Sequence, residues 1–161
     1  MHDLGHIKRV QKIVLELAAN YPEANLKLIN LSLYFHGVIH LENGEKSIIS
    51  FLQSKGMSKR NIDLVIRIAW DSEKNTSAET IVSIEGKIAH DAHLLEGGKT
   101  FLIVKTLCTG VAIGKTLEES LQYLQEQVLG KFHCLLPEAQ ELYALKEAYA
   151  NDFLHDLQNH L

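Results

Sequence analysis

The stretch IVSIEGKIAHDAHLLEGG, residues 81–98, decides how the rest of the chain is interpreted. With the 3.6-residue period of an α-helix, its apolar side chains form one stripe made of Ile81, Ile84, Ile88 and Leu95. Asp91 falls on that stripe, between Ile88 and Leu95. Because a buried unpaired carboxylate costs several kcal/mol or takes up a proton, we expect Asp91 to have a metal ion, a cation or a set of donors as its partner.

Two histidines, His90 and His93, flank Asp91 on the same expected helix. His93 lies two residues further along, on another face, and His90 lies about 100° round the helix axis. We therefore expect both side chains to be exposed or at the boundary of the core, unless a pocket opens on their side.

The length and composition are those of one ordinary globular domain. A chain of 161 residues, 46% of them hydrophobic, can bury a sizeable core, so we expect a single domain over residues 1–161. The net charge of −4 gives no basic surface for nucleic acid, although a small phosphorylated ligand remains compatible with it. Homo-oligomerisation is left open by the sequence.

Cysteine content and hydropathy indicate the cellular compartment. Cys108 and Cys134 could form one bridge at most, and we expect both to be reduced and packed in the core. No apolar run reaches the roughly eighteen residues needed to span a bilayer, and no secretory signal opens the chain. The expectation is a cytoplasmic protein without a membrane partner.

The pattern of apolar residues predicts an all-α helical bundle, because alternation typical of strands is scarce. Expected helices begin or end at recognisable caps: Ser58 as an N-cap, Thr116 with Glu119 as a capping box, and Pro137 as a first helical residue. The approximate helical ranges are 4–19, 24–36, 45–55, 58–70, 81–97, 100–109, 116–130 and 137–161. In the last of these, we expect an inward face formed by Leu142, Leu145, Ala148 and Phe153.

Three of these helices each carry one metal-capable residue on the apolar side. His6 lies one turn before Val10, His36 follows Leu33 by three residues, and Asp91 lies on the stripe described above. Imidazole and carboxylate together suit a divalent cation, and a bundle can bring such residues together in its core. Hydrogen-bonded core histidines and a capped aspartate explain the same pattern without a metal.

Four segments, taken in order, resemble the HD-domain metal-dependent phosphohydrolase superfamily, in particular its small single-domain bacterial members. They are HDLGHIKRV (2–10), LSLYFHG (31–37), SIEGKIAHDAHLLEGG (83–98) and AQELYALKEAYANDFLHDL (139–157). In the last segment Lys146 stands where the family usually has Arg. The resemblance covers nearly the whole chain.

The resemblance implies a helical HD-type domain that uses a divalent metal ion to hydrolyse a nucleotide or another small phosphoester. It implies His6, His36 and Asp91 as metal ligands, with His36 and Asp91 also catalytic. The chain departs from the family at Gly37, where an Asp ligand is usual, and at His93, which replaces the second Asp of a DAD-like segment.

Two consequences of Gly37 stay open. His40, one turn beyond His36, could replace the missing ligand if a helix continues through Gly37. Alternatively, the chain is a catalytically degenerate HD scaffold that binds a small ligand or a protein partner.

Overall fold

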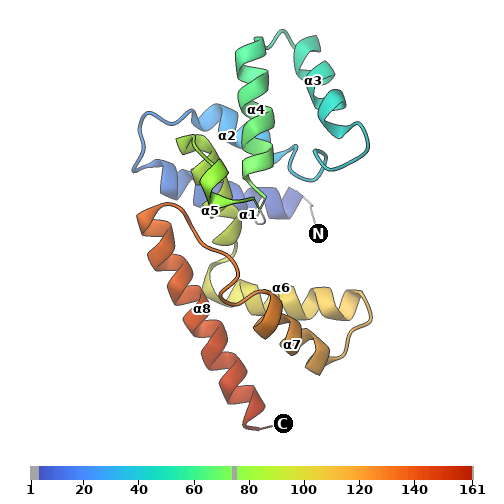
Figure 1. Ribbon diagram of the computed structural model, residues 1–161, viewed down its shortest axis with the longest axis vertical. Coiled ribbons are helices and arrows are strands. Elements are labelled where there is room, and N and C mark those ends of the chain that lie inside the picture. The colour runs from blue at the N-terminus through green and yellow to red at the C-terminus, as the bar shows by residue number, and fades with distance from the viewer. Residues whose placement is uncertain (1–3, 74–75, 161) are drawn as a thin grey trace. The chain divides into compact units, whose positions relative to one another are not determined.

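The computed structural model describes residues 4–73 and 76–160, and this part of the chain is all-α, as predicted (Figure 1). It contains eight α-helices and one short 3₁₀-helix, and no strand occurs within these ranges. The chain divides into two compact units, residues 1–94 and 95–161. A single domain over residues 1–161 stays a prediction.

The first unit is built around one central helix. Its elements are α1 (Leu4–Ala18), α2 (Leu26–Leu33), α3 (Gly44–Ser54), α4 (Lys59–Asp71), the 3₁₀-helix η1 (Ala78–Thr80) and α5 (Ile84–Leu94). Helix α5 packs against α1, α2 and α4, and α3 packs against α4. The helix that comes from the stretch 81–98 is therefore surrounded by three others.

Caps and periodic apolar residues account for the helix limits in this unit. The Ser58 hydroxyl accepts a hydrogen bond from the Asn61 amide, and the Asn25 side chain caps α2 by accepting from the Leu28 amide. Gly56 has a φ of 74° just beyond α3, a conformation that glycine adopts without strain. The predicted cap at Ser58 is thus confirmed.

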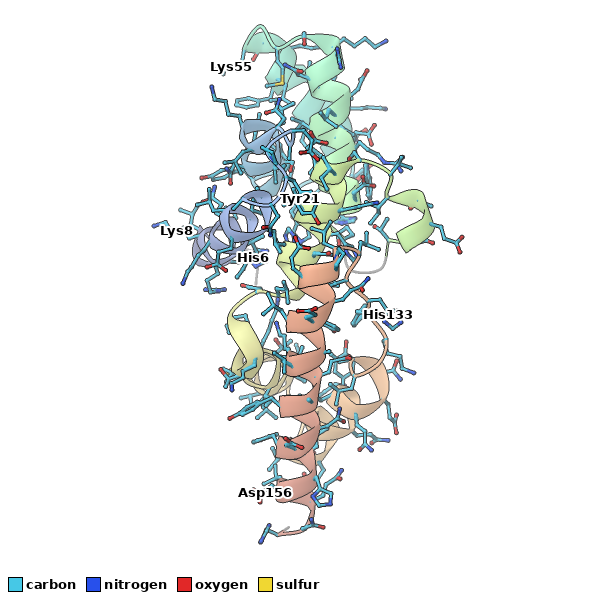
Figure 2. All side chains as sticks on the ribbon, turned by 90° about the vertical axis from the view of Figure 1, so that its left-hand side faces the viewer. His6, Lys8, Tyr21, Lys55, His133 and Asp156 are labelled. Carbon is cyan, nitrogen blue, oxygen red and sulfur yellow. The ribbon has the colours of Figure 1, made fainter. Side chains whose placement is uncertain are left out.

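Burial in the first unit follows the expected apolar faces, with one correction. Val10, Val14 and Leu17 of α1 are buried, and His6 is buried one turn before them. Figure 2 shows Lys8 directed away from the same helix, where it is exposed. The prediction that His90 is exposed or at the boundary was wrong: it is only 2% exposed, because α5 is covered on several sides rather than along one stripe.

The second unit consists of α6 (Gly98–Ala112), α7 (Leu117–Gln127) and α8 (Pro137–Gln158). Thr116 and Glu119 form the predicted capping box, and Pro137 is the first residue of α8, as predicted. The core of this unit is formed by Ile103, Leu121, Leu124, Val128, Ala150 and Leu154. Of the two cysteines, Cys134 is buried and Cys108 is exposed, so the expectation of a core-packed Cys108 was wrong.

The inward face of α8 differs from the prediction. Leu142 and Leu145 are 51% and 64% exposed. The buried residues of this helix are Ala139, Tyr143, Lys146, Ala150 and Leu154. Lys146 belongs to this face because its Nζ donates a hydrogen bond of 2.9 Å to the carbonyl of Glu96, so a polar residue occupies a position that hydropathy assigns to solvent.

No helix within the described ranges is long and apolar enough to cross a membrane.

Replacing Lys146 should destabilise the protein far more than replacing its exposed neighbour. We expect Lys146→Ala to lower the free energy of unfolding by about 2–4 kcal/mol, because it leaves a cavity and removes the donor to the Glu96 carbonyl. Leu145→Ala should change the same free energy by less than about 0.5 kcal/mol. Urea denaturation measures both, and equal effects would contradict the burial pattern of α8.

Candidate metal centre

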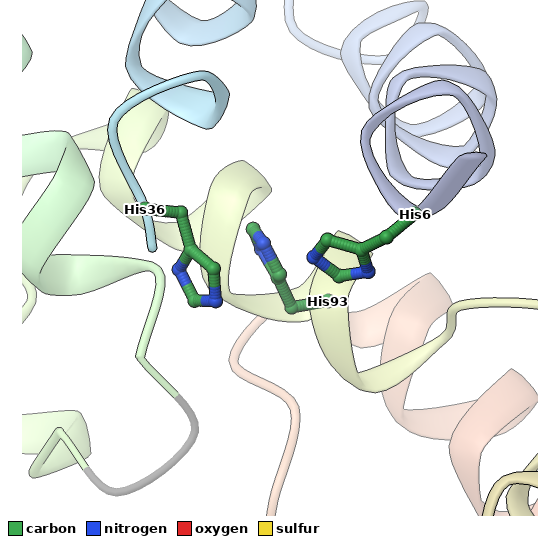
Figure 3. A group of neighbouring side chains, drawn as sticks. All are labelled: His6, His36 and His93. Atoms are coloured by element: carbon green, nitrogen blue, oxygen red, sulfur yellow. The ribbon is translucent and has the colours of Figure 1, made fainter. Parts of the chain in front are cut away.

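Three histidines from three parts of the first unit come together (Figure 3). His6 lies on α1, His36 in the turn after α2, and His93 near the end of α5. Each offers one nitrogen, and these nitrogens all lie within 4.8 Å of one another. The ring of His93 is 4.2 Å from that of His36 and 5.3 Å from that of His6, measured between centroids. We call these residues the three-histidine group.

His93 has the protonation state that a metal ligand requires. Its Nδ1 lies 2.8 Å from the carbonyl of Ala89, and a carbonyl only accepts, so Nδ1 carries the proton and Nε2 the lone pair. Burial lowers the pKa of His93, the nearby ring of His36 lowers it further, and the result is a pKa of about 3. The imidazole is therefore neutral around pH 7.

His36 is held through its Nδ1, which lies 3.0 Å from the hydroxyl of Ser72 and 2.8 Å from Oε1 of Glu73. In Figure 3 the other ring nitrogen of His36 lies on the side of His93. This orientation presents Nε2 of His36 to the three-histidine group.

Glu73 also contacts a second histidine. Its Oε1 lies 2.8 Å from Nε2 of His40. Burial raises the pKa of Glu73, but hydrogen bonding to His36 and His40 outweighs burial and lowers this pKa to about 2. The carboxylate is therefore ionised at all but strongly acidic pH.

Among the residues predicted as ligands, the structure brings His6 and His36 together. Asp91 is fully buried, as expected for a residue on the stripe, and its Oδ1 lies 2.9 Å from Nδ1 of His90. It is not part of the three-histidine group, and its role as a ligand stays a prediction. His40 likewise lies outside the group, beside Glu73, because the chain from residue 34 to residue 40 forms turns rather than a continuous helix.

His93 was not predicted as a metal ligand from the sequence. One apolar stripe was assigned to the helix, and His93 lies off that stripe. Because α5 is enclosed by α1, α2 and α4, residues on several of its faces point into the unit. The available signal was the position of His93 in the segment that resembles the family, where it replaces the second Asp.

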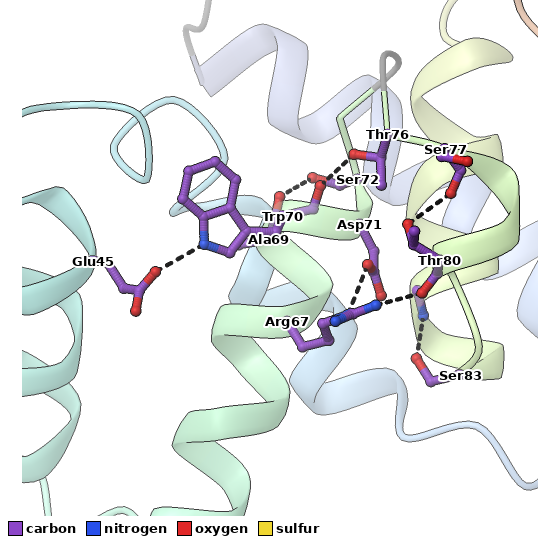
Figure 4. A network of polar contacts seen from close by, with 11 residues as sticks. Glu45, Arg67, Ala69, Trp70, Asp71, Ser72, Thr76, Ser77, Thr80 and Ser83 are labelled. Atoms are coloured by element: carbon purple, nitrogen blue, oxygen red, sulfur yellow. Dashed lines mark hydrogen bonds and ion pairs between the residues drawn. The ribbon is translucent and has the colours of Figure 1, made fainter.

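A polar network around the buried Asp71 ties the end of α4 to η1 (Figure 4). Asp71 is 2% exposed, and its Oδ1 accepts a hydrogen bond of 3.0 Å from Nε of Arg67. The same guanidinium donates to the carbonyl of Thr80 at the end of η1. Burial raises the pKa of Asp71, although Arg67 partly opposes this.

Gly86 of α5 leaves the space that the side chain of Asp71 occupies. A Cβ at this position would overlap Oδ2 of Asp71. Helical glycine is normally about 0.5–1 kcal/mol less favourable than alanine. Here the close approach of the two helices requires it.

Replacing a helical glycine by alanine usually stabilises a protein, but Gly86→Ala should destabilise this one. We expect a loss of about 1–3 kcal/mol in the free energy of unfolding, because the new Cβ displaces Asp71 from Arg67. Chemical denaturation measures this, and a stabilised variant would show that α4 and α5 are less closely packed than described.

The three-histidine group fits a divalent transition-metal ion. Two ligands at about 2.1 Å from one ion can be no more than about 4.2 Å apart, so small side-chain rotations would close the group on a cation. Imidazole is a common ligand of zinc, copper, iron and nickel. Three histidines leave at least one coordination position for water or substrate, which is the arrangement of catalytic rather than structural zinc sites.

Several solved structures share the fold of this chain. Residues covering 99% of this chain superpose on 86% of an HD-superfamily hydrolase from Bacillus thuringiensis, with a TM-score of 0.78 and 23% identity. Bacillus subtilis YpgQ, crystallised in complex with ADP, gives a TM-score of 0.78 and 20% identity over 99% of this chain and 87% of YpgQ. The Lin1889 protein from Listeria innocua gives a TM-score of 0.76 and 25% identity over 98% of this chain and 86% of the Lin1889 chain.

No protein-family model matches the chain, and no curated protein matches it by sequence. The chain has the fold of the HD-superfamily hydrolases, as its sequence motifs predicted.

The neutral state of His93 should make the metal-free protein sensitive to acid. The unfolded chain binds a proton at His93 near pH 6.5, whereas the folded protein does so only near pH 3. Stability should therefore fall as the pH drops through this window, with His93 contributing up to about 1.4 kcal/mol per pH unit.

Urea denaturation in EDTA between pH 6.5 and pH 4.5 measures this dependence, because Glu73 loses its contribution mainly below its unfolded pKa of 4.5. Asp71, whose pKa is raised, acts with the opposite sign, so the wild type is compared with a variant at His93. His93→Asn should flatten the dependence of stability on pH in that range. An unchanged slope in the variant would contradict a neutral His93 in the folded protein.

Proposed function

We propose that this chain is a metal-dependent phosphohydrolase that acts on a nucleotide or another small phosphoester. The observation that carries the proposal is the three-histidine group, to which α1, α5 and the turn after α2 each contribute one imidazole. We propose His93 rather than Asp91 as the third metal ligand, because Asp91 is paired with His90.

The ligand set determines the electrostatics of the proposed site. When bound, a divalent cation supplies a Lewis acid for a phosphoryl oxygen and acidifies a water molecule for attack on phosphorus. His6, His36 and His93 would hold the ion without adding negative charge, because neutral imidazoles replace the usual carboxylates. The site would then keep nearly the full charge of the ion, which favours an anionic substrate.

Nucleotides are the first substrate class to test. YpgQ, which shares the fold, was crystallised with ADP. That ligand belongs to YpgQ, but a nucleoside polyphosphate also suits the phosphoester chemistry proposed for this chain. The net charge of −4 makes a small phosphorylated molecule a more suitable partner than a nucleic-acid polymer.

Metal analysis and a substrate screen test the proposal. We expect the purified protein to bind a divalent transition metal and to hydrolyse nucleotides or generic phosphoesters faster when metal is added. His36→Ala and His93→Ala should lose both metal binding and turnover. His133→Ala, which removes an exposed histidine of the second unit, should change neither.

A second candidate function is a degenerate HD scaffold that binds a small ligand or a protein partner without catalysis. Gly37 favours it, because the position that supplies a carboxylate ligand in the family has no side chain. A protein that binds no metal and shows no metal-stimulated turnover would support the scaffold. Metal-dependent hydrolysis that His36→Ala abolishes would exclude it.

A further inference from the structure

His36 lies in an irregular part of the chain, unlike the other two members of the group. His6 and His93 lie on α1 and α5, where the helical backbone fixes their direction. Residues 34–40 form consecutive turns after α2, so the backbone there is not held by a continuous helical ladder. Something other than helix geometry has to fix the ring of His36.

Glu73 provides such a constraint from the end of α4. The same oxygen, Oε1, lies 2.8 Å from Nδ1 of His36 and 2.8 Å from Nε2 of His40. These two histidines are the first and last residues of one irregular segment, residues 36–40. One carboxylate, two residues beyond α4, therefore contacts both ends of that segment.

The hydrogen-bond partners of His36 select one tautomer. The hydroxyl of Ser72 donates its proton to the carbonyl of Ala69 at 2.7 Å, so it can only accept from Nδ1 of His36. The Ser72 contact therefore requires the proton on Nδ1, the ring nitrogen that also lies 2.8 Å from Oε1 of Glu73. The lone pair is then on Nε2, on the side of His93 in Figure 3.

His40 is itself held in place on its other side. Its ring packs edge-on against Trp70, with the centroids 5.0 Å apart. The indole nitrogen of Trp70 donates a 2.9 Å hydrogen bond to Glu45 of α3 (Figure 4). His40 thus connects Glu73 to a fixed aromatic side chain rather than joining the three-histidine group.

We propose that Glu73 is a positioning residue of the metal centre, which cross-links His36 and His40 and holds His36 with Nε2 directed at the ion. This inference rests on the proposed function. A carboxylate that accepts from the outer nitrogen of a ligating histidine fixes the ring and makes the coordinating nitrogen more basic. Glu73 would supply this carboxylate next to a ligand set that contains none.

The test compares metal affinity in Glu73→Ala, Glu73→Gln and wild type. Calorimetric titration with Zn²⁺ or Co²⁺ should show about 10–100-fold weaker binding in Glu73→Ala. Glu73→Gln keeps the shape and one acceptor oxygen but loses the charge, so its affinity should lie between the other two. Glu16→Gln is the matched control, because Glu16 is an exposed carboxylate of α1 outside this network, and its affinity should equal that of wild type.

Two spectroscopic measurements separate positioning from a merely structural role. In the metal-free protein, nitrogen NMR of the histidine rings should find His36 protonated on Nδ1. Glu73→Ala should increase the share of the other tautomer, because Ser72 alone then accepts from Nδ1. The Co²⁺ absorption spectrum should keep the same coordination number in Glu73→Ala. A spectrum that reports the loss of a carboxylate ligand would overturn the inference, because Glu73 would then bind the ion directly.

The remaining outcomes distinguish this inference from the proposed function. If the metal affinity of Glu73→Ala stays within about twofold of the wild-type affinity, the positioning role alone is overturned, because the expected loss is about 10–100-fold. Absence of metal binding in the wild type overturns the proposed function and the inference together.

Discussion

The enclosure of α5 is the constraint on which the first unit depends. Three helices pack around it, so a side chain on this helix meets protein on several faces and not only along one stripe. Its sequence contains an aspartate and two histidines within four residues, and each of these must find a partner inside the protein. His90 and Asp91 bond to each other, and His93 bonds the carbonyl one turn back. Packing therefore gives these neighbouring polar residues different hydrogen-bond partners.

The polar interior also uses small and charged residues to bring helices close. Gly86 permits the carboxylate of Asp71 to lie against α5, and Arg67 compensates that carboxylate while tying down η1. In the second unit, Lys146 similarly reaches a backbone carbonyl from the buried face of α8. Asp71 and Lys146 each have one specific polar partner, which lowers the cost of burying them.

Much of the fold could be predicted from the sequence, because helix limits depend on local chemistry. Ser58, Thr116 and Pro137 begin helices where capping rules place them. The candidate site was harder to predict than the helix limits, since the placement of His93 and Glu73 depends on tertiary packing. The position of His93 requires knowing that α5 is enclosed, and the role of Glu73 requires knowing that the end of α4 meets the turn after α2. The buried face of α8 was also predicted wrongly from hydropathy. Lys146 is buried on this face because the Glu96 carbonyl accepts a hydrogen bond from its Nζ.

The wide separation of His6, His36 and His93 along the chain has a thermodynamic consequence. The three nitrogens are neighbours only while α1, α5 and the turn after α2 are assembled, so the unfolded chain has no equivalent site. An ion that binds there would act as a removable cross-link, and its binding energy would be added to the stability of the first unit in proportion to the logarithm of free metal concentration. The availability of metal in the surroundings would then determine how often this unit opens locally, and with it the lifetime of the protein against proteases.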